Sequence, residues 1–239
     1  MRKIVLALLA VVLGASALPV PAAPAPPQWV EGTHYTLLDQ PQPTTVPPGK
    51  VEVMEIFSYA CPFCDKFQPI VHQLQRSLPR YAQMVYLPAS FLPAEDWPVF
   101  QQAYFAAQSL GIADRTHQAM YDAVWKNGAL ATVDPATNEL KHPAPSLEAI
   151  AHYYSQLTGV DPEKFLTAAR SFGVATQMRQ ADAEITAMQV PGTPCIVVDG
   201  KYRVEMDSLR TPADIISVVN FLVAKAHSQH RHPAARPSA

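Results

Sequence analysis

Residues 51–64 read VEVMEIFSYACPFC, a run of β-formers that passes through a short turn into a Cys-x-x-Cys pair. The first seven residues alternate in polarity and are mostly apolar, which predicts a strand over Val51–Phe57. Residues 58–60 turn the chain, and Pro62 is favourable in the first turn of a helix that begins at Cys61. The stretch therefore predicts a strand that leads directly into a helix carrying two cysteines in its first turn.

The position of these cysteines favours negative charge. The first turn of a helix has unpaired N–H groups and the positive end of the helix dipole. We expect this environment to stabilise the thiolate of Cys61 and to lower its pKa, whereas Cys64 lies one turn deeper and is better buried. Since the thiolate is the reactive form in disulfide exchange, Cys61 is the predicted nucleophile and Cys64 the predicted resolving cysteine.

Zinc binding is the main alternative for a Cys-x-x-Cys pair. A structural zinc site needs four ligands and commonly uses two such pairs. Here the remaining partners are Cys195 and scattered histidines, so redox chemistry without a metal or organic cofactor is the favoured interpretation. Cys195 follows Pro194 at the start of a second β-type run, and we expect it to be a small buried core residue.

The beginning of the chain is typical of a secretory signal. Arg2 and Lys3 precede an apolar run over residues 4–13, followed by candidate cleavage sites after Ala17 and Ala23. The run is shorter than the roughly 20 apolar residues of a membrane-spanning helix, which disfavours the alternative of an uncleaved anchor. We therefore expect residues 1–23 to be a signal peptide, with cleavage after 23 or after 17. Export to the periplasm would place the cysteines where disulfides form and persist.

The rest of the chain is predicted to be an α/β domain interrupted by a helical block. The chain has 239 residues, 49% of them hydrophobic, which is enough to bury a substantial core. It carries 18 basic and 20 acidic residues with no long run of one sign, which gives no indication of nucleic-acid binding. Strands are expected at 35–38, 51–57, 83–89, 195–198 and, behind an Asp199-Gly200 turn, 201–204. The expected divisions are a first sheet part at 28–95, a helical insert at 96–189, a second sheet part at 190–227 and a flexible tail at 228–239.

Two further features accompany the cysteines. Glu55 lies six residues before Cys61 in an otherwise apolar strand. A buried carboxyl there could exchange a proton with the thiol of Cys64. The alternative is an exposed position, because Glu52 suggests that the strand can carry surface acids. Pro194 precedes the second β-type run, where a cis bond after Thr193 would make a tight turn.

In combination these features resemble the DsbA family of periplasmic disulfide oxidases. The resemblance spans nearly all of the mature chain and is carried by four blocks: Cys61-Pro62-Phe63-Cys64, Glu55-Ile56-Phe57-Ser58-Tyr59-Ala60, Gly192-Thr193-Pro194 and Val198-Asp199-Gly200-Lys201-Tyr202. It implies a thioredoxin fold with an inserted all-helical domain and Glu55 at the family's buried acid position. It also implies that Pro194 is cis and that Pro62, Phe63, Thr193 and Pro194 help to bind extended peptide.

Phe63 departs from the best-known pattern of that family, which is Cys-Pro-His-Cys. The missing histidine would add a hydrogen-bond donor and a positive charge near the thiolate, so the oxidising strength stays open. The Cys-Pro-Phe-Cys form resembles the oxidising DsbL branch of the family. The resemblance further implies reoxidation by a DsbB-like quinone-linked membrane protein. We expect reduced, unfolded exported proteins as substrates and a monomeric state.

Two other functions remain as alternatives. A disulfide isomerase or reductase of the DsbC or DsbG kind carries an N-terminal dimerisation domain. Only about 27 residues, Ala23 to Gly49, precede the first long strand, which is below the ~40-residue floor for a small domain. The second alternative is a metal-delivery protein that uses its thiols as ligands. The histidines near the C-terminus, His227, His230 and His232, are expected in a solvated tail.

Overall fold

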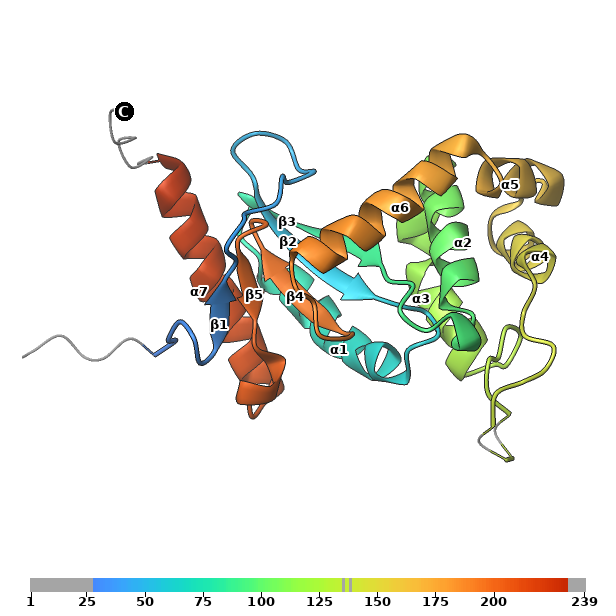
Figure 1. The fold of residues 1–239 in the computed structure, drawn as a ribbon, viewed down its shortest axis with the longest axis horizontal. Coiled ribbons are helices and arrows are strands. Elements are labelled where there is room, and N and C mark those ends of the chain that lie inside the picture. The colour runs from blue at the N-terminus through green and yellow to red at the C-terminus, as the bar shows by residue number, and fades with distance from the viewer. Residues whose placement is uncertain (1–27, 135, 138, 232–239) are drawn as a thin grey trace, which may run out of the picture.

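The computed structural model describes residues 28–134, 136–137 and 139–231, so the predicted signal peptide lies outside the described part (Figure 1). Its centre is a five-stranded mixed sheet with the strand order β1-β5-β4-β2-β3. The strands are β1 (Tyr35–Leu37), β2 (Val51–Phe57), β3 (Ala82–Pro88), β4 (Cys195–Val198) and β5 (Tyr202–Val204). β2 pairs parallel with β3 and antiparallel with β4. The two parts of the sheet, far apart in sequence, therefore meet at β2.

The helices form two groups. α1 (Pro62–Ser77) and α7 (Pro212–Arg231) pack on one face of the sheet, against apolar side chains of β2 and β4 such as Val53 and Ile196. The other group gathers at one end of the sheet (Figure 1). It comprises α2 (Trp97–Ser109), α3 (Ala113–Trp125), α4 (Leu147–Thr158), α5 (Pro162–Ala169) and α6 (Phe172–Ala187). Short 3₁₀ turns lie at Pro93–Glu95 and Met206–Ser208. The architecture is an α/β sheet interrupted by an all-helical block, as the sequence predicts.

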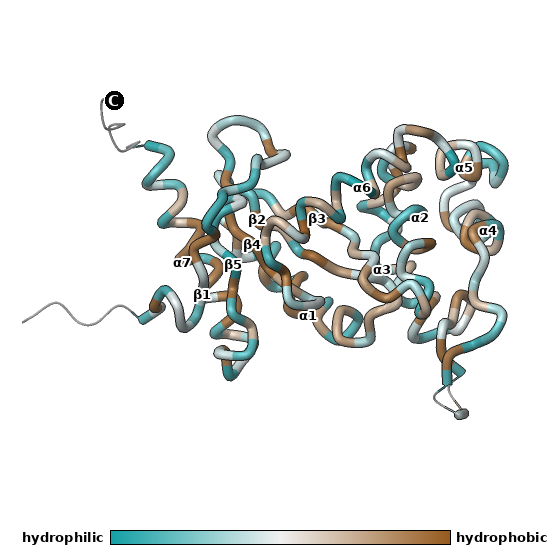
Figure 2. Tube along the Cα trace, in the orientation of Figure 1, coloured by the Kyte–Doolittle hydropathy of each residue, from teal (hydrophilic) through white to brown (hydrophobic). Residues whose placement is uncertain are grey.

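Strand β2 lies at the centre of the molecule and every one of its residues is buried. This burial overturns the expectation that Glu52 marks an exposed position on the strand, because its side chain is fully buried. The carboxylate of Glu52 instead accepts hydrogen bonds from the backbone N–H and the hydroxyl of Thr45, both at 2.7 Å. The loop that carries Thr45 thus supplies partners for Oε2 of this buried acid, while Oε1 has no hydrogen-bond partner within the described residues. Figure 2 shows β4, the partner of β2, as a hydrophobic stretch at the same centre.

The hairpin between β4 and β5 has the predicted turn. Asp199 and Gly200 both adopt positive φ angles, 58° and 59°, as a two-residue turn of this kind requires. The N–H of Gln42 donates to the carbonyl of Gly200 at 2.8 Å, so the chain before β2 packs directly on the turn.

Helix α7 extends to Arg231, and the expectation of a flexible tail from residue 228 is therefore wrong up to that point. His230 Nε2 lies 2.9 Å from Asp199 Oδ2 in the hairpin turn, and the hydroxyl of Tyr202 donates to Gln229 at 3.0 Å. His227 stacks on the ring of Tyr81 with 3.9 Å between centroids. These long-range contacts stabilise the last turns of α7. The local sequence there is polar and by itself predicts a frayed end. His232 lies outside the described residues.

Candidate active site

The turn before α1 presents Cys61 at the helix start. Cys61 is the N-cap residue, and its sulfur accepts a hydrogen bond from the N–H of Cys64 at 3.4 Å. The hydroxyl of Ser58 accepts from the N–H of Ala60 at 3.2 Å, which fixes the turn between strand and helix. Cys61 and Cys64 are both buried as residues and are free thiols in this structure. The predicted strand-to-helix arrangement therefore brings both cysteines to one helix end.

The two thiols differ strongly in acidity. The pKa of Cys61 is lowered to about 6, chiefly by a hydrogen bond from the side chain of Cys64. The Thr193 side chain and the N–H groups of Phe63 and Cys64 act in the same direction, against the effect of burial. Burial raises the pKa of Cys64 well above its ordinary value. At neutral pH the first sulfur is thus mostly a thiolate and the second a thiol, which matches a nucleophile and a resolving group.

A loop from the far end of the sequence faces the helix start. The Thr193–Pro194 peptide bond is cis, and the sulfur of Cys61 lies 3.5 Å from the carbonyl oxygen of Thr193. The loop leads into β4, whose first residue is Cys195. Burial raises the pKa of Cys195 to about 12, so this third thiol is a poor nucleophile at neutral pH. As expected, Cys195 is a buried residue that opens a core strand.

Glu55 lies beneath the cysteines in the middle of β2. It pairs in register with Tyr86 of β3 and Ile196 of β4, and its side chain is fully buried. Burial raises the pKa of this carboxyl to about 8, partly offset by a hydrogen bond from Gln68 at 3.4 Å. The carboxyl is therefore mostly protonated at neutral pH. Gln68 contacts both the Glu55 carboxyl and the backbone carbonyl of Cys64, at 3.4 and 3.5 Å, so this acid lies near the redox pair.

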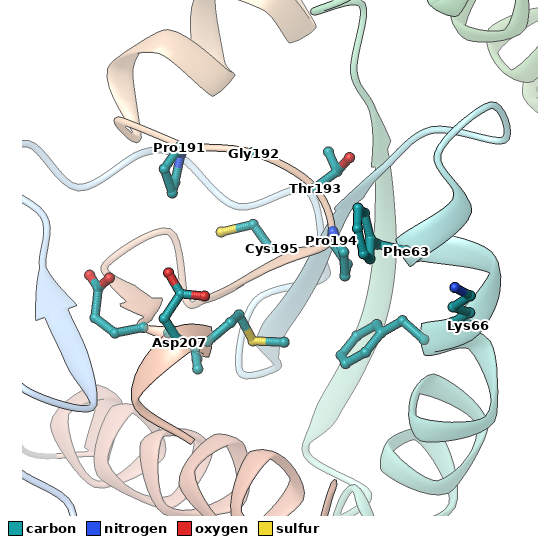
Figure 3. A pocket seen from close by; sticks show the side chains of 12 residues that line it. Phe63, Lys66, Pro191, Gly192, Thr193, Pro194, Cys195 and Asp207 are labelled. Carbon is teal, nitrogen blue, oxygen red and sulfur yellow. The ribbon is translucent and has the colours of Figure 1, made fainter. Parts of the chain in front are cut away.

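Two cavities flank Phe63, which is 66% exposed. One, of about 490 Å³, lies under the cis-proline loop (Figure 3). Figure 3 shows Phe63 beside Thr193 and Pro194, with Asp207 on the opposite side of the cavity. The other cavity, of about 500 Å³, reaches Cys61 itself and includes Phe91, Leu92, Trp97 and Pro191. An extended chain lying along the cis-proline loop would thus find recesses on both sides of Phe63, one of which reaches Cys61.

Sequence reasoning missed several residues that surround the cysteines. Phe91 and Leu92 follow β3 and are 39% and 43% exposed, so their apolar pairing in a loop was a usable signal. Gln68 is buried on α1 and touches Glu55, but a polar residue in an amphipathic helix gives no such signal.

The described residues, 28–134, 136–137 and 139–231, contain no cluster of three or more His, Cys, Asp or Glu side chains arranged to hold a metal ion. In the same part of the chain, no helix has the length and apolar character needed to cross a bilayer.

Comparisons with known proteins agree with this geometry. The DSBA-like thioredoxin domain model matches residues 52–217. The thiol:disulfide interchange protein DsbA of Pseudomonas aeruginosa is 33% identical over 198 residues, covering 82% of this chain and 85% of that protein. The protein of the same name from Azotobacter vinelandii is 32% identical over 189 residues, covering 78% of this chain and 81% of that protein.

Solved structures show the same likeness. The crystal structure of Pseudomonas aeruginosa DsbA aligns with a TM-score of 0.69 at 32% identity, covering 85% of this chain and 97% of that one. The oxidoreductase DsbA from Xylella fastidiosa aligns with a TM-score of 0.69 at 28% identity, covering 82% of this chain and 96% of that one. The predicted thioredoxin fold with an inserted helical domain is confirmed. The chain therefore belongs to the DSBA-like thioredoxin domain family of thiol:disulfide oxidoreductases.

Proposed function

We propose that the chain is a periplasmic oxidase that introduces disulfide bonds into reduced, unfolded exported proteins. The observation that carries this proposal is the asymmetry of the redox pair. Cys61 caps the helix and has a pKa of about 6, whereas the pKa of Cys64 is raised by burial. A sulfur that is stable as a thiolate is a good leaving group, so a disulfide to Cys61 is readily broken by a substrate thiol.

The cycle starts from the Cys61–Cys64 disulfide. A substrate thiolate attacks the sulfur of Cys61, a mixed disulfide forms, and Cys64 leaves as a thiolate. Because burial disfavours that thiolate, Glu55 gives its proton to Cys64 and becomes a carboxylate. A second substrate thiolate then attacks the substrate sulfur of the mixed disulfide and releases the thiolate of Cys61. Two electrons pass from the substrate dithiol to the enzyme, and the substrate leaves oxidised.

Substrate binding is assigned to the residues around the cis-proline loop. The backbone of Thr193 and Pro194 offers an edge for an extended peptide, while Pro62 and Phe63 supply apolar contact beside the reacting sulfur. Backbone and apolar contacts of this kind depend little on the amino-acid sequence of the substrate, so they can bind many different unfolded chains.

The electrons must leave the enzyme for the next cycle. We propose a DsbB-like quinone-linked membrane protein as the acceptor, and a monomer as the working form. The supporting evidence is the family membership, together with the secretory signal expected at residues 1–23.

The test uses two single serine variants of the mature protein and a reduced test protein. Cys61→Ser should abolish oxidation of the test protein, because no disulfide can form. Cys64→Ser is given the same test protein in its disulfide-bonded form. Its Cys61 thiolate opens that disulfide, releases one thiolate of the test protein and should accumulate a mixed disulfide, seen by non-reducing electrophoresis and mass spectrometry. The Cys61→Ser/Cys64→Ser double variant is the matched control and should trap nothing. Trapping by Cys61→Ser alone would show that the roles are reversed.

A further inference from the structure

Within the described residues, Gln68 is the one polar side chain that connects Glu55 with the backbone of the resolving cysteine. It lies one turn after Cys64 on α1 and is only 2% exposed. Its Nε2 donates to Glu55 Oε1 at 3.4 Å and to the backbone carbonyl of Cys64 at 3.5 Å. Among the described residues, no other side chain forms a hydrogen bond with the Glu55 carboxyl.

No cation faces Glu55 within ion-pairing distance in the described part of the chain. The titratable groups that act on it, or that it acts on, are Cys61 and Cys64 from α1, Tyr86 from β3, Tyr104 from α2 and Tyr121 from α3. His117 of α3 packs on the ring of Tyr86, and burial lowers its pKa to about 3, so it is neutral. Because no charged group pairs with Glu55, its one hydrogen-bond partner, the amide of Gln68, has a large effect on the position and the pKa of the carboxyl.

We propose that Gln68 is the positioning residue of the proton relay, holding Glu55 in place in both of its protonation states. The proposal rests on the proposed function of Glu55 as the proton donor to Cys64. A primary amide carries both a donor and an acceptor. Its N–H₂ group donates to the ionised carboxylate, and its oxygen accepts from the protonated carboxyl.

Two buried atoms are free to make the second arrangement. Gln68 Oε1 and Glu55 Oε2 have no other hydrogen-bond partner within the described residues. When Cys64 leaves as a thiolate, Glu55 transfers its proton to that sulfur, and Gln68 presents its N–H₂ group to the new carboxylate. On reoxidation, the ionised fraction of Glu55 takes the proton of Cys64, and the amide turns its oxygen toward the carboxyl. A lysine here would favour only the ionised acid, and a methionine would serve neither state.

The test measures how fast a reduced peptide forms the mixed disulfide with the oxidised protein, across pH. Gln68→Met, similar in size but without hydrogen bonds, should slow this step about fivefold to tenfold near neutral pH. The infrared carboxyl band of Glu55 should persist to higher pH than in the wild type. Gln101→Met is the matched control, because Gln101 is a buried glutamine in the helical insert that donates to Pro88 and Asp182. It should leave both readouts unchanged.

Gln68→Glu shows whether Gln68 acts through its hydrogen bonds to Glu55 or only by filling space in the core. A protonated carboxyl is again both donor and acceptor, so this variant should match the wild type in acid and lose rate as the new carboxyl ionises. A rate loss that does not depend on pH, or a Gln68→Met variant with an unchanged Glu55 band, overturns the proposal. If Gln68→Met does not fold, the pH profile of Gln68→Glu decides alone. Glu55→Gln tests the proposed proton transfer separately. If this variant forms the mixed disulfide at the wild-type rate, Glu55 is not the proton donor, and the proposed function of Glu55 fails together with the role of Gln68.

Discussion

Glu55 shows how one residue can cost stability in exchange for chemistry. Its pKa rises from 4.5 to about 8 on folding, so the native protein must bind a proton that the unfolded chain releases. This penalty is absent below the unfolded pKa and grows as pH rises toward the folded pKa. We expect Glu55→Gln to stabilise the protein near pH 7 by on the order of 3 kcal/mol, and not at all near pH 4. Urea unfolding at both pH values checks this, and equal effects at the two would contradict it.

Phe63 affects the pKa of Cys61 because its side chain carries neither a charge nor a hydrogen-bond donor. It is an exposed apolar ring, whereas a histidine there would add a donor and, when protonated, a positive charge. We expect Phe63→His to lower the pKa of Cys61 below its present value of about 6. The ultraviolet absorbance of the thiolate, titrated against pH, gives this value directly. Phe63→Gln adds polarity without charge and should shift the pKa less; a larger shift in that variant would refute the role of charge.

At the scale of elements, the β4–β5 hairpin depends on a close backbone approach. A Cβ on Gly200 would lie 2.2 Å from the carbonyl oxygen of Gln42, and the residue also has a positive φ. We expect Gly200→Ala to destabilise the protein by more than about 2 kcal/mol, since strain and collision add. Gly128→Ala has a similar positive φ with no atom within 4 Å, so it should cost only about 1 kcal/mol. If thermal unfolding shows the same loss of stability in both variants, the backbone at Gln42 moves away from the new Cβ at little cost in free energy, and the prediction is wrong.

The same elements show what local sequence can predict. The β2–α1 unit followed from the alternation over Val51–Phe57 and from Pro62, because both signals act between near neighbours. The last turn of α7 did not, because its support comes from Asp199, about thirty residues away. The burial of Glu52 depends likewise on the loop that carries Thr45. In the site, the cysteines and the Thr193–Pro194 block were evident from motif order, whereas the role of Gln68 became visible only once the chain had packed.

Across the whole molecule, the helical insert is joined to the active-site turn through buried polar contacts. The indole of Trp125 donates to the carbonyl of Tyr59 at 2.8 Å, and the hydroxyl of Tyr59 lies 3.0 Å from His117 Nδ1. Tyr59 is two residues before Cys61 and is 1% exposed. The insert therefore supports the helix start that stabilises the thiolate, in addition to lining one of the cavities.

The balance between oxidised and reduced protein is also a property of the whole molecule. Closing Cys61 to Cys64 makes a loop of about four residues, which favours the oxidised form by only ~2 kcal/mol. The reduced form gains from the Cys61 thiolate, whose pKa falls from 9.0 to about 6 on folding. A depressed pKa contributes stability that is complete above the unfolded value and is lost as pH falls through the folded value. At pH 7 that contribution is about 1.4 kcal/mol, slightly less than the effect of loop closure.

We therefore expect the two redox forms to be nearly equal in stability just above neutral pH. The oxidised form should be more stable near pH 5, and the reduced form near pH 9, by about 2 kcal/mol in each case. The measurement is urea unfolding of both forms at pH 5, 7 and 9, with Cys61→Ser as the control that removes the thiolate. A reduced form that is already the more stable at pH 5 would indicate a lower folded pKa and a stronger oxidant. An oxidised form that stays more stable at pH 9 would remove the thiolate argument for an oxidase and favour a reductase.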